Sequence, residues 1–274
     1  MKKARMLFVS QEITPYVEEN QMSIISRQLP QGILEAGKEI RTFMPRYGLI
    51  NERRHQLHEV IRLSGMNLII NDFDHPLIIK VASIPAARMQ VYFIDNEDYF
   101  SRKAVTTDKN GNIFADTDER IIFFCRGVIE TCRKLGWAPH IIHCAGWMTS
   151  LLPMYIRKSF GDDPLFEESR IVYSIYDDEF KGNLNKELAT KAFFEGITKE
   201  DVKHLKSGPN YTGLIKTAID FSDAVIKVVP KANAEIEKHL KKCDKPVLDH
   251  PGEDYIDMYN DFYDAVLEEE SAFA

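Results

Sequence analysis

The chain has 274 residues, of which 44% are hydrophobic and 28% charged, as in an ordinary globular protein. Its formal net charge of −7 and its scattered Lys and Arg residues argue against nucleic-acid binding. No apolar run is long enough for a membrane span or a signal peptide, and the four cysteines show no C-x-x-C spacing. We therefore expect a cytoplasmic protein with reduced thiols and with no membrane attachment, metal site or cofactor.

The first part of the chain alternates between strand and helix patterns. Pro30 should kink or divide a helix at residues 23–36, and Gly37 should end it. Short apolar segments without long helices between them then indicate antiparallel hairpins within residues 55–95. The strands expected in this part lie at residues 5–10, 38–44, 60–63, 67–70, 76–83 and 90–94.

Helices return in the second part of the chain. Asp116 and Glu119 are spaced as a capping box, and Gly136 should close the helix that they start. Pro230 is expected to open another helix. The remaining elements are expected at residues 140–144, 170–175 and 224–229 for strands and 147–158 and 212–221 for helices.

The last predicted element is an acidic and aromatic segment, in which Tyr255, Tyr259, Phe262 and Val266 share one helical face. The whole pattern predicts one α/β domain over residues 1–250, followed by an acidic C-terminal helix or tail over 251–274. This domain should be Rossmann-like and doubly wound, with a mostly parallel sheet and a small antiparallel hairpin insertion.

Several separated motifs resemble the N-terminal half of bacterial and plant glycogen or starch synthases. Together they cover nearly the whole chain in order and at near-constant spacing. This resemblance to glycosyltransferase family 5 implies one half of a GT-B fold. The matching residues are Ser10, Glu12, Pro15, Leu29, Pro30, Gly37, Pro45, Tyr47, Gly48, Tyr92-Phe93-Ile94-Asp95-Asn96, Tyr99-Phe100, Asp118-Glu119-Arg120, Phe123-Phe124, Arg126, Leu135-Gly136-Trp137, Pro139, His143, Trp147, Thr149, Leu151, Pro153 and Tyr155.

The family's donor-binding loop is altered here. In the family, a K-T-G-G-L loop lies against the phosphates of ADP-glucose. The corresponding residues are Glu18-Glu19-Asn20-Gln21-Met22, so Glu18 replaces the lysine and Asn20 and Gln21 replace the glycines. A carboxylate facing a diphosphate is repulsive, and the added Cβ atoms restrict the loop. No standard phosphate loop of the G-x-G-x-x-G or G-x-x-x-x-G-K-[ST] type is present elsewhere.

Two further family blocks are eroded. The H-x-H-D-W-H block reads His143-Cys144-Ala145-Gly146-Trp147-Met148, and the T-I-H-N block reads Ser174-Ile175-Tyr176-Asp177. The family also carries a second Rossmann-like domain, which this chain is expected to lack because it ends soon after Pro230. Catalysis of this class relies on positioning and closure of a cleft between the two domains.

The resemblance therefore implies a vestigial cleft with no intact catalytic residue. His143 is interpreted as a residue that hydrogen-bonds neighbouring backbone groups in preference to a sugar ligand, and Trp147 as core in preference to a sugar platform. Glu12 either caps the first loop or faces the cleft. A solvated loop is preferred to a cation site at Glu18 and Glu19. The candidate cleft residues are Glu12, Pro15, Tyr16, Glu18, Tyr47, His143, Trp147, Tyr176 and Asp177.

Two functions remain open. The altered loop favours a binding or regulatory protein that contacts an α-glucan, a metabolite or another protein. The alternative is glucosyl transfer from ADP-glucose to an α-1,4-glucan, completed by a separate chain that supplies the second domain. Because no second domain covers the cleft edge, its aromatic residues should be exposed, or covered by the C-terminal helix or by a homodimer partner.

Overall fold

The computed structural model describes residues 3–268. Residues 1–2, from the basic start, and 269–274, from the predicted acidic tail, lie outside the described residues. The strands are β1 (Arg5–Ser10), β2 (Glu39–Pro45), β3 (His58–Glu59), β4 (Met66–Ile70), β5 (Phe73–Ile84), β6 (Met89–Asp95), β7 (Ile141–Ala145), β8 (Arg170–Ile175), β9 (Ala224–Lys227) and β10 (Val247–Asp249).

Helices separate most of the parallel strands. The α-helices are α1 (Gln21–Glu35), α2 (Glu97–Phe100), α3 (Thr117–Leu135), α4 (Leu152–Ser159), α5 (Leu188–Lys191), α6 (Tyr211–Phe221), α7 (Ala234–Leu240) and α8 (Tyr255–Glu268). The short 3₁₀ helices are η1 (Pro85–Ala87), η2 (Trp147–Thr149) and η3 (Lys203–Leu205).

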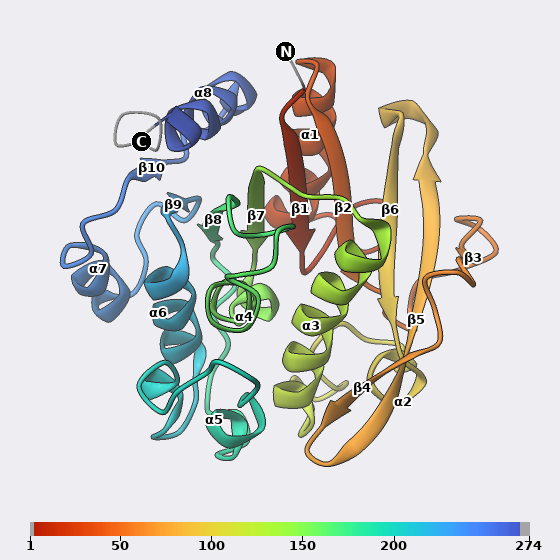
Figure 1. Cartoon of the computed structure of the whole chain (residues 1–274), viewed down its shortest axis with the longest axis vertical. Coiled ribbons are helices and arrows are strands. Elements are labelled where there is room, and N and C mark those ends of the chain that lie inside the picture. Colours follow the sequence, from red (N-terminus) through yellow and green to blue (C-terminus); the bar gives the residue numbers. More distant parts are fainter. Residues whose placement is uncertain (1–2, 269–274) are drawn as a thin grey trace.

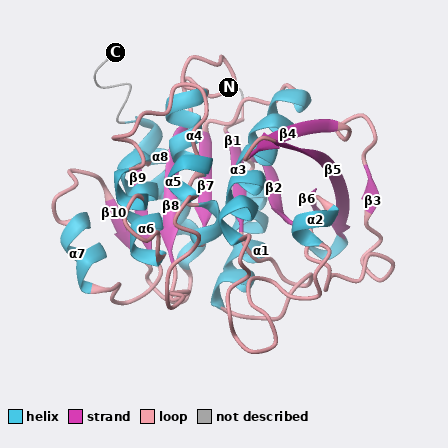
Figure 2. Ribbon diagram, turned by 90° about the horizontal axis from the view of Figure 1, so that it is seen from below, coloured by secondary structure: helices cyan, strands magenta, loops and turns pink. Residues whose placement is uncertain are grey.

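Within residues 3–268, the strands build one ten-stranded sheet in the order β10-β9-β8-β7-β1-β2-β6-β5-β3, with β4 paired to β5 (Figure 1). All pairs from β10 to β6 are parallel. Strand β5 runs antiparallel to β6, β3 and β4. The β4–β5 hairpin lies at one end of the sheet, beside α2 and α3 (Figure 2). The predicted α/β fold, with its mostly parallel sheet and its hairpin insertion, is confirmed.

The two faces of the sheet are covered by different helices, because side chains alternate along each strand. Met6 and Phe8 of β1 face a core that contains the apolar faces of α1 and α8. Leu7 and Val9 face the opposite core, which contains residues of α3, α4 and α6. The domain is therefore doubly wound, and α8 completes the layer that α1 begins.

Proline affects the helices less than the sequence suggests. Helix α1 is continuous through Pro30, because its buried face packs on the sheet and outweighs one missing backbone hydrogen bond. Helix α7 begins at Ala234, where the Asn233 side chain accepts a hydrogen bond from the backbone N–H of Ile236. The prediction that Pro230 opens this helix is therefore wrong, since an asparagine cap three residues later starts it.

Two predictions about helix starts need correction. Asp116 precedes α3 but makes no capping hydrogen bond, because its carboxylate pairs with Arg102. Glu119 pairs instead with Lys191 at 2.7 Å, so the predicted capping box is not formed. The single helix predicted at 147–158 is divided into η2 and α4, and Pro153 lies in the first turn of α4.

The C-terminal helix was predicted by its apolar face. Tyr255, Tyr259 and Val266 are buried against the sheet, and Phe262 is partly buried. The same face buries Tyr263, which the prediction did not include. Among residues 3–268, the structure has no helix that is both long enough and apolar enough to cross a bilayer.

Candidate functional site

The carboxyl ends of the parallel strands meet at one edge of the sheet, where open α/β domains bind their ligands. The residues that follow β1, β7 and β8 at this edge are Gln11, Gly146 and Tyr176. The loop from Gln11 to Asn20 connects β1 to α1 and contains four of the predicted cleft residues. This strand-end edge is the candidate site.

Gln11 connects the loop to the neighbouring strand end. Its backbone N–H donates to the Ala145 carbonyl at 3.1 Å, and its Oε1 accepts from the Met148 N–H at 3.2 Å. The Tyr47 hydroxyl donates to the Gln11 carbonyl at 3.0 Å. Gln11 therefore uses its polar groups within the protein, although no sequence pattern marks it as a site residue.

The N-terminus of α1 is closed by its own residues. The Asn20 Oδ1 accepts from the Ser23 N–H at 2.8 Å, while the Ser23 Oγ accepts from the Asn20 N–H at 2.9 Å. The Asn20 Nδ2 also donates to the Glu12 Oε2 at 2.5 Å. Glu12 thus supports the cap of the first helix, a role that differs from the two predicted for it, which were capping of the first loop and a position facing the cleft. We call Glu12, Asn20 and Ser23 the Asn20 cap.

Gly146 leaves no room for a side chain at the end of β7. Its φ is +86°, and a Cβ added there would lie 2.9 Å from the Met22 Sδ and 3.0 Å from the Gln11 Cβ. By the resemblance described above, this position carries the family's aspartate. Here Met22 and Gln11 occupy the space beside it.

Asp178 is the most perturbed acid at this edge. It is partly buried, with Oδ1 accepting from the Tyr211 hydroxyl at 3.0 Å and Oδ2 accepting from the Trp147 N–H at 3.3 Å. Burial raises the pKa of its carboxyl group to about 7. Its neighbour Asp177, which the sequence selected, is exposed. Two acidic residues after a predicted strand mark this position in the sequence, but only the fold shows that Asp178, and not Asp177, turns inward.

His143 lies in the core beneath α8. Its Nε2 is 2.5 Å from the Ser174 Oγ, and its Nδ1 is 2.8 Å from the Tyr263 hydroxyl. Burial lowers the pKa of the imidazole to about 3, so it is neutral at physiological pH. The prediction that it bonds to its neighbours is right, although these are side chains and not the expected backbone groups.

Of the expected alternatives, exposure fails for three of the cleft aromatics, which are buried within the same chain. Tyr47 and Trp147 are buried, and Trp147 packs edge-on against Phe180 with 4.8 Å between ring centroids. Tyr16 is buried against Phe93, and burial raises the pKa of its hydroxyl to about 12. The prediction that Trp147 is a core residue is confirmed.

The C-terminal helix covers one residue of the predicted cleft. Tyr176 lies in the same buried cluster as Tyr255 and Tyr259 of α8. Pro15 and Glu18 remain exposed. The structure therefore brings Glu12, Tyr47, Trp147 and Tyr176 to one closed edge, while His143 lies deeper under the sheet face.

An open groove lies between the β4–β5 hairpin and the segment around α5. Its volume is about 510 Å³. The guanidinium of Arg126 lies 4.1 Å from the Phe194 ring centroid and donates to the Ile69 carbonyl at 2.6 Å. Phe193 is 40% exposed in it. We call this the hairpin groove; its lining residues are Asn67, Ile69, Asn71, Asp72, Arg126, Thr190, Lys191, Phe193 and Phe194.

The chain also carries free thiols and a group that could bind a metal ion. Among the described residues, the group spaced to hold a metal ion is His204, Asp220 and His239, which lies apart from the strand-end edge. Cys125 and Cys132 are buried free thiols. Burial raises the pKa of the Cys132 thiol to about 12, which keeps it protonated and unreactive.

Known proteins resemble this chain in sequence and in fold. The family profile described as the starch synthase catalytic domain matches residues 5–245. A glycogen synthase of Chlorobaculum parvum is 32% identical over 246 residues, covering 87% of this chain and 50% of that relative. A glycogen synthase of Chlorobium phaeobacteroides is 34% identical over 220 residues, covering 78% of this chain and 45% of the relative.

A solved structure shows the same fold. The catalytic domain of starch synthase IV from Arabidopsis thaliana, described as bound to ADP and acarbose, aligns with a TM-score of 0.71 and 17% identity. The alignment covers 90% of this chain and 51% of that one. The chain thus spans about half the length of the curated relatives it matches. With the family profile covering residues 5–245 and the GT-B half confirmed by fold, the chain belongs to the starch synthase catalytic domain family.

Proposed function

We propose that this glycogen synthase-like domain does not take up a sugar nucleotide and instead binds an α-glucan as a non-catalytic or regulatory protein. The Asn20 cap is the observation that carries the first part. A free helix N-terminus attracts phosphate through its unpaired N–H groups and its dipole. At α1 the Asn20 side chain already occupies the Ser23 N–H, and the Glu12 carboxylate is bonded to that side chain.

Charge and space at the same edge support the proposal. Glu18 and Glu19 are exposed beside the cap, so a diphosphate approaching α1 would meet two further carboxylates. At the end of β7, Met22 and Gln11 fill the space that a side chain at Gly146 would need. A donor would therefore have to displace contacts that the domain already makes with itself.

The hairpin groove supports the glucan part of the proposal. The relatives are glycogen synthases, and the Arabidopsis neighbour is described with acarbose bound, so an α-glucan is the ligand class to test. Aromatic rings stack on the apolar faces of sugars. Amide groups donate hydrogen bonds to hydroxyls and accept them from hydroxyls, and carboxylates accept them. The groove offers Phe193 together with Asn71 and Asp72.

Calorimetric titration with ADP-glucose tests the first part. The wild-type chain should give no binding near a Kd of 1 µM, about −8 kcal/mol. The variant Glu18→Lys/Asn20→Gly/Gln21→Gly restores the family's charge and glycines and should bind more tightly than the wild type. Micromolar binding of ADP-glucose by the wild type would refute the proposed loss of the donor site.

Affinity electrophoresis in gels that contain glycogen tests the second part. Glycogen should retard the wild type, and Phe193→Ala should abolish the retardation. Phe73→Ala is the matched control, because Phe73 is 67% exposed on the same hairpin but does not line the groove. If glycogen leaves the wild type unretarded, the glucan assignment is wrong. Glucose incorporation from ADP-glucose after adding a glycogen synthase C-terminal half would support the alternative, a split transferase.

A further inference from the structure

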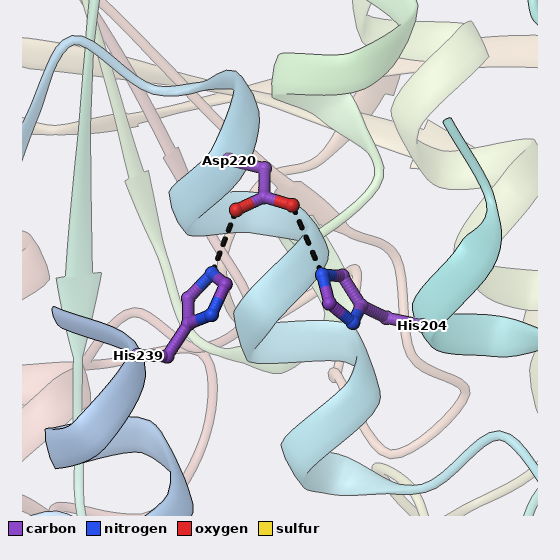
Figure 3. A group of neighbouring side chains, drawn as sticks. All are labelled: His204, Asp220 and His239. Atoms are coloured by element: carbon purple, nitrogen blue, oxygen red, sulfur yellow. Dashed lines mark hydrogen bonds and ion pairs between the residues drawn. The ribbon is translucent and has the colours of Figure 1, made fainter. Parts of the chain in front are cut away.

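Three side chains from separate elements converge on the outer side of α6. Asp220 lies near the C-terminal end of α6, His204 lies in η3, and His239 lies near the end of α7 (Figure 3). The His204 Nε2 is 3.0 Å from the Asp220 Oδ2, and the His239 Nε2 is 2.6 Å from the Asp220 Oδ1. The two rings are nearly perpendicular, at 86°. Both present Nε2 to the one carboxylate.

We propose that His204, Asp220 and His239 form a binding site for a divalent transition-metal ion of the Zn²⁺ type. Two imidazoles and one carboxylate are a donor set that zinc accepts, with water as the fourth ligand. The candidate ligand atoms all lie within 4.8 Å of one another. Magnesium and calcium prefer sites built from oxygen ligands alone.

Only small movements separate the present geometry from a coordinated one. Two ligands that are each about 2.1 Å from a tetrahedral ion lie about 3.4 Å apart. The two nitrogen–oxygen distances of 3.0 and 2.6 Å would therefore open by less than 1 Å around an ion, and the other ligand separations, which are at most 4.8 Å, would close by up to about 1.4 Å. An imidazole whose Nε2 carries a proton would move it to Nδ1 or release it on binding the ion, so that Nε2 offers its lone pair to the metal.

The candidate ligands are accessible to solvent, and the elements that carry them are held in place by packing. The side chains of His204, Asp220 and His239 are 22%, 24% and 18% exposed, which leaves a path for the ion and its water. The backbones that carry them are packed together, because Asp220 and His239 belong to helices α6 and α7, which contact each other, as do α6 and η3. Packed elements hold ligands in place better than a mobile surface loop does.

Nearby ammonium groups set a limit on the affinity. Lys245 Nζ donates to the carbonyls of Ile219, Asp220 and Ser222 at 2.5 to 2.8 Å, so one cation already sits at the end of α6. The charge of Lys203 also acts on His204. With one anionic ligand and these neighbours, micromolar binding is expected and not the far tighter binding of cysteine-rich structural zinc sites.

An ion at this site would stabilise the folded domain and would not take part in glucosyl transfer. The C-terminal end of α6 precedes β9, so Asp220 lies toward the amino end of that strand, at the opposite edge from the Asn20 cap. A bound ion would join η3, α6 and α7 through one centre. The inference is independent of the proposed function, because it uses none of the residues at the strand-end edge or in the hairpin groove.

The test is calorimetry and thermal melting of the full chain with Zn²⁺. The wild type should bind one ion with a micromolar Kd, and Zn²⁺ at about one hundred times that Kd should raise Tm by at least about 5 °C. Mg²⁺ at the same concentration should leave Tm unchanged. Co²⁺ should give the visible absorption of a tetrahedral site.

The variants His204→Gln, His239→Gln and Asp220→Asn should each weaken Zn²⁺ binding by about tenfold or more. Asp220→Asn is the most informative variant, because it removes the anionic ligand with little change in shape. Its amide oxygen can accept from one imidazole, and its amide nitrogen can donate to the other once the proton of that ring is on Nδ1. His58→Gln is the matched control, since His58 is exposed on β3. Absence of one-to-one binding below about 100 µM, or equal binding by Asp220→Asn and the wild type, would overturn the proposal.

Discussion

Among single residues, Asp178 has the clearest effect on how the stability of the protein depends on pH. Its pKa is about 7 in the folded protein because of burial, compared with 3.8 for a free side chain. Between these two values the folded state holds a proton that the unfolded state has lost. Stability is therefore lost as the pH rises through this window, by at most about 1.4 kcal/mol per pH unit, and levels off above pH 7.

Asp178→Asn should flatten this pH dependence. The asparagine keeps an acceptor for the Trp147 N–H and a donor for the Tyr211 hydroxyl, but it has no proton to lose. The variant should therefore gain stability relative to the wild type between pH 5 and pH 8, as measured by urea unfolding at both values. Asp177→Asn, at the exposed neighbour, should change nothing in this comparison. An unchanged wild-type slope in Asp178→Asn would contradict the assignment.

Some residues could be assigned from the sequence because local chemistry decides them. Gly37 and Gly136 end their helices with positive φ, as the patterns predict, since only local backbone geometry is involved. Gln11, Asp178 and Gly146 could not be assigned, because their roles depend on which side chains the fold brings beside them. The same applies to His204 and His239, which are 35 positions apart in sequence and meet only through Asp220.

At the scale of elements, the contact between α1 and α8 depends on a missing side chain. Gly32 lies inside α1, where a Cβ would come 2.5 Å from the Cγ2 of Ile256. Nearby, the Tyr255 hydroxyl donates to the Gln28 Oε1 at 3.2 Å, and Lys38 pairs with Asp264 at 2.5 Å. The glycine lets the two helices approach closely enough to make these contacts.

The effect of Gly32→Ala on the free energy of unfolding should therefore change sign when Ile256 is also replaced. In the wild type the new methyl group collides with a β-branched side chain, and the clash should outweigh the gain of about 1 kcal/mol in helix propensity. In an Ile256→Ala background the same substitution should stabilise the protein. Chemical denaturation of the two single variants and the double variant measures the coupling. Equal effects in both backgrounds would show that the helices are not packed as described.

Element types were more predictable than element starts. Strand 170–175 was predicted with the observed boundaries, since apolar patterning defines a buried strand. The start of α3 at Asp116 was predicted, but its capping box is not formed because Asp116 and Glu119 pair with cations. The start of α7 was missed because Asn233 caps the helix in place of Pro230. Such choices between local and tertiary partners do not appear in spacing alone.

At the scale of the whole molecule, the fold was predicted and the closure of its site only in part. Alternating patterns and the family resemblance predicted the doubly wound sheet with its hairpin insertion. They also predicted cleft aromatics that are either exposed or covered by the C-terminal helix or a homodimer partner. Tyr176 does lie in the cluster beneath α8, but Tyr47 and Trp147 are buried within the rest of the chain. The difference arises because coverage depends on how loops fold back, which periodicity does not describe.

Removing α8 should affect the whole domain. A chain that ends at His250 keeps β10 but uncovers the sheet face beneath Tyr259, Tyr263 and Val266. Each such side chain contributes about 1.5–3 kcal/mol, so the shortened chain should melt much lower or associate. Thermal melting measures the loss of stability, and light scattering measures the association. Met258→Ala is the control, because Met258 lies on α8 and is 45% exposed, and it should leave Tm nearly unchanged. Equal Tm values for shortened and full chains, both monomeric, would show that α8 stabilises nothing.

The position of α8 also determines the order in which the molecule can be completed during synthesis. Its contacts join residues far apart in the chain, such as Lys38 with Asp264 and Gln28 with Tyr255, which are separated by 226 and 227 positions. The sheet can pair its central strands while translation continues, but the face that holds Phe8 stays uncovered until α8 has left the ribosome. Nascent chains therefore display an apolar surface that finished molecules do not, and that surface is where a chaperone would bind them.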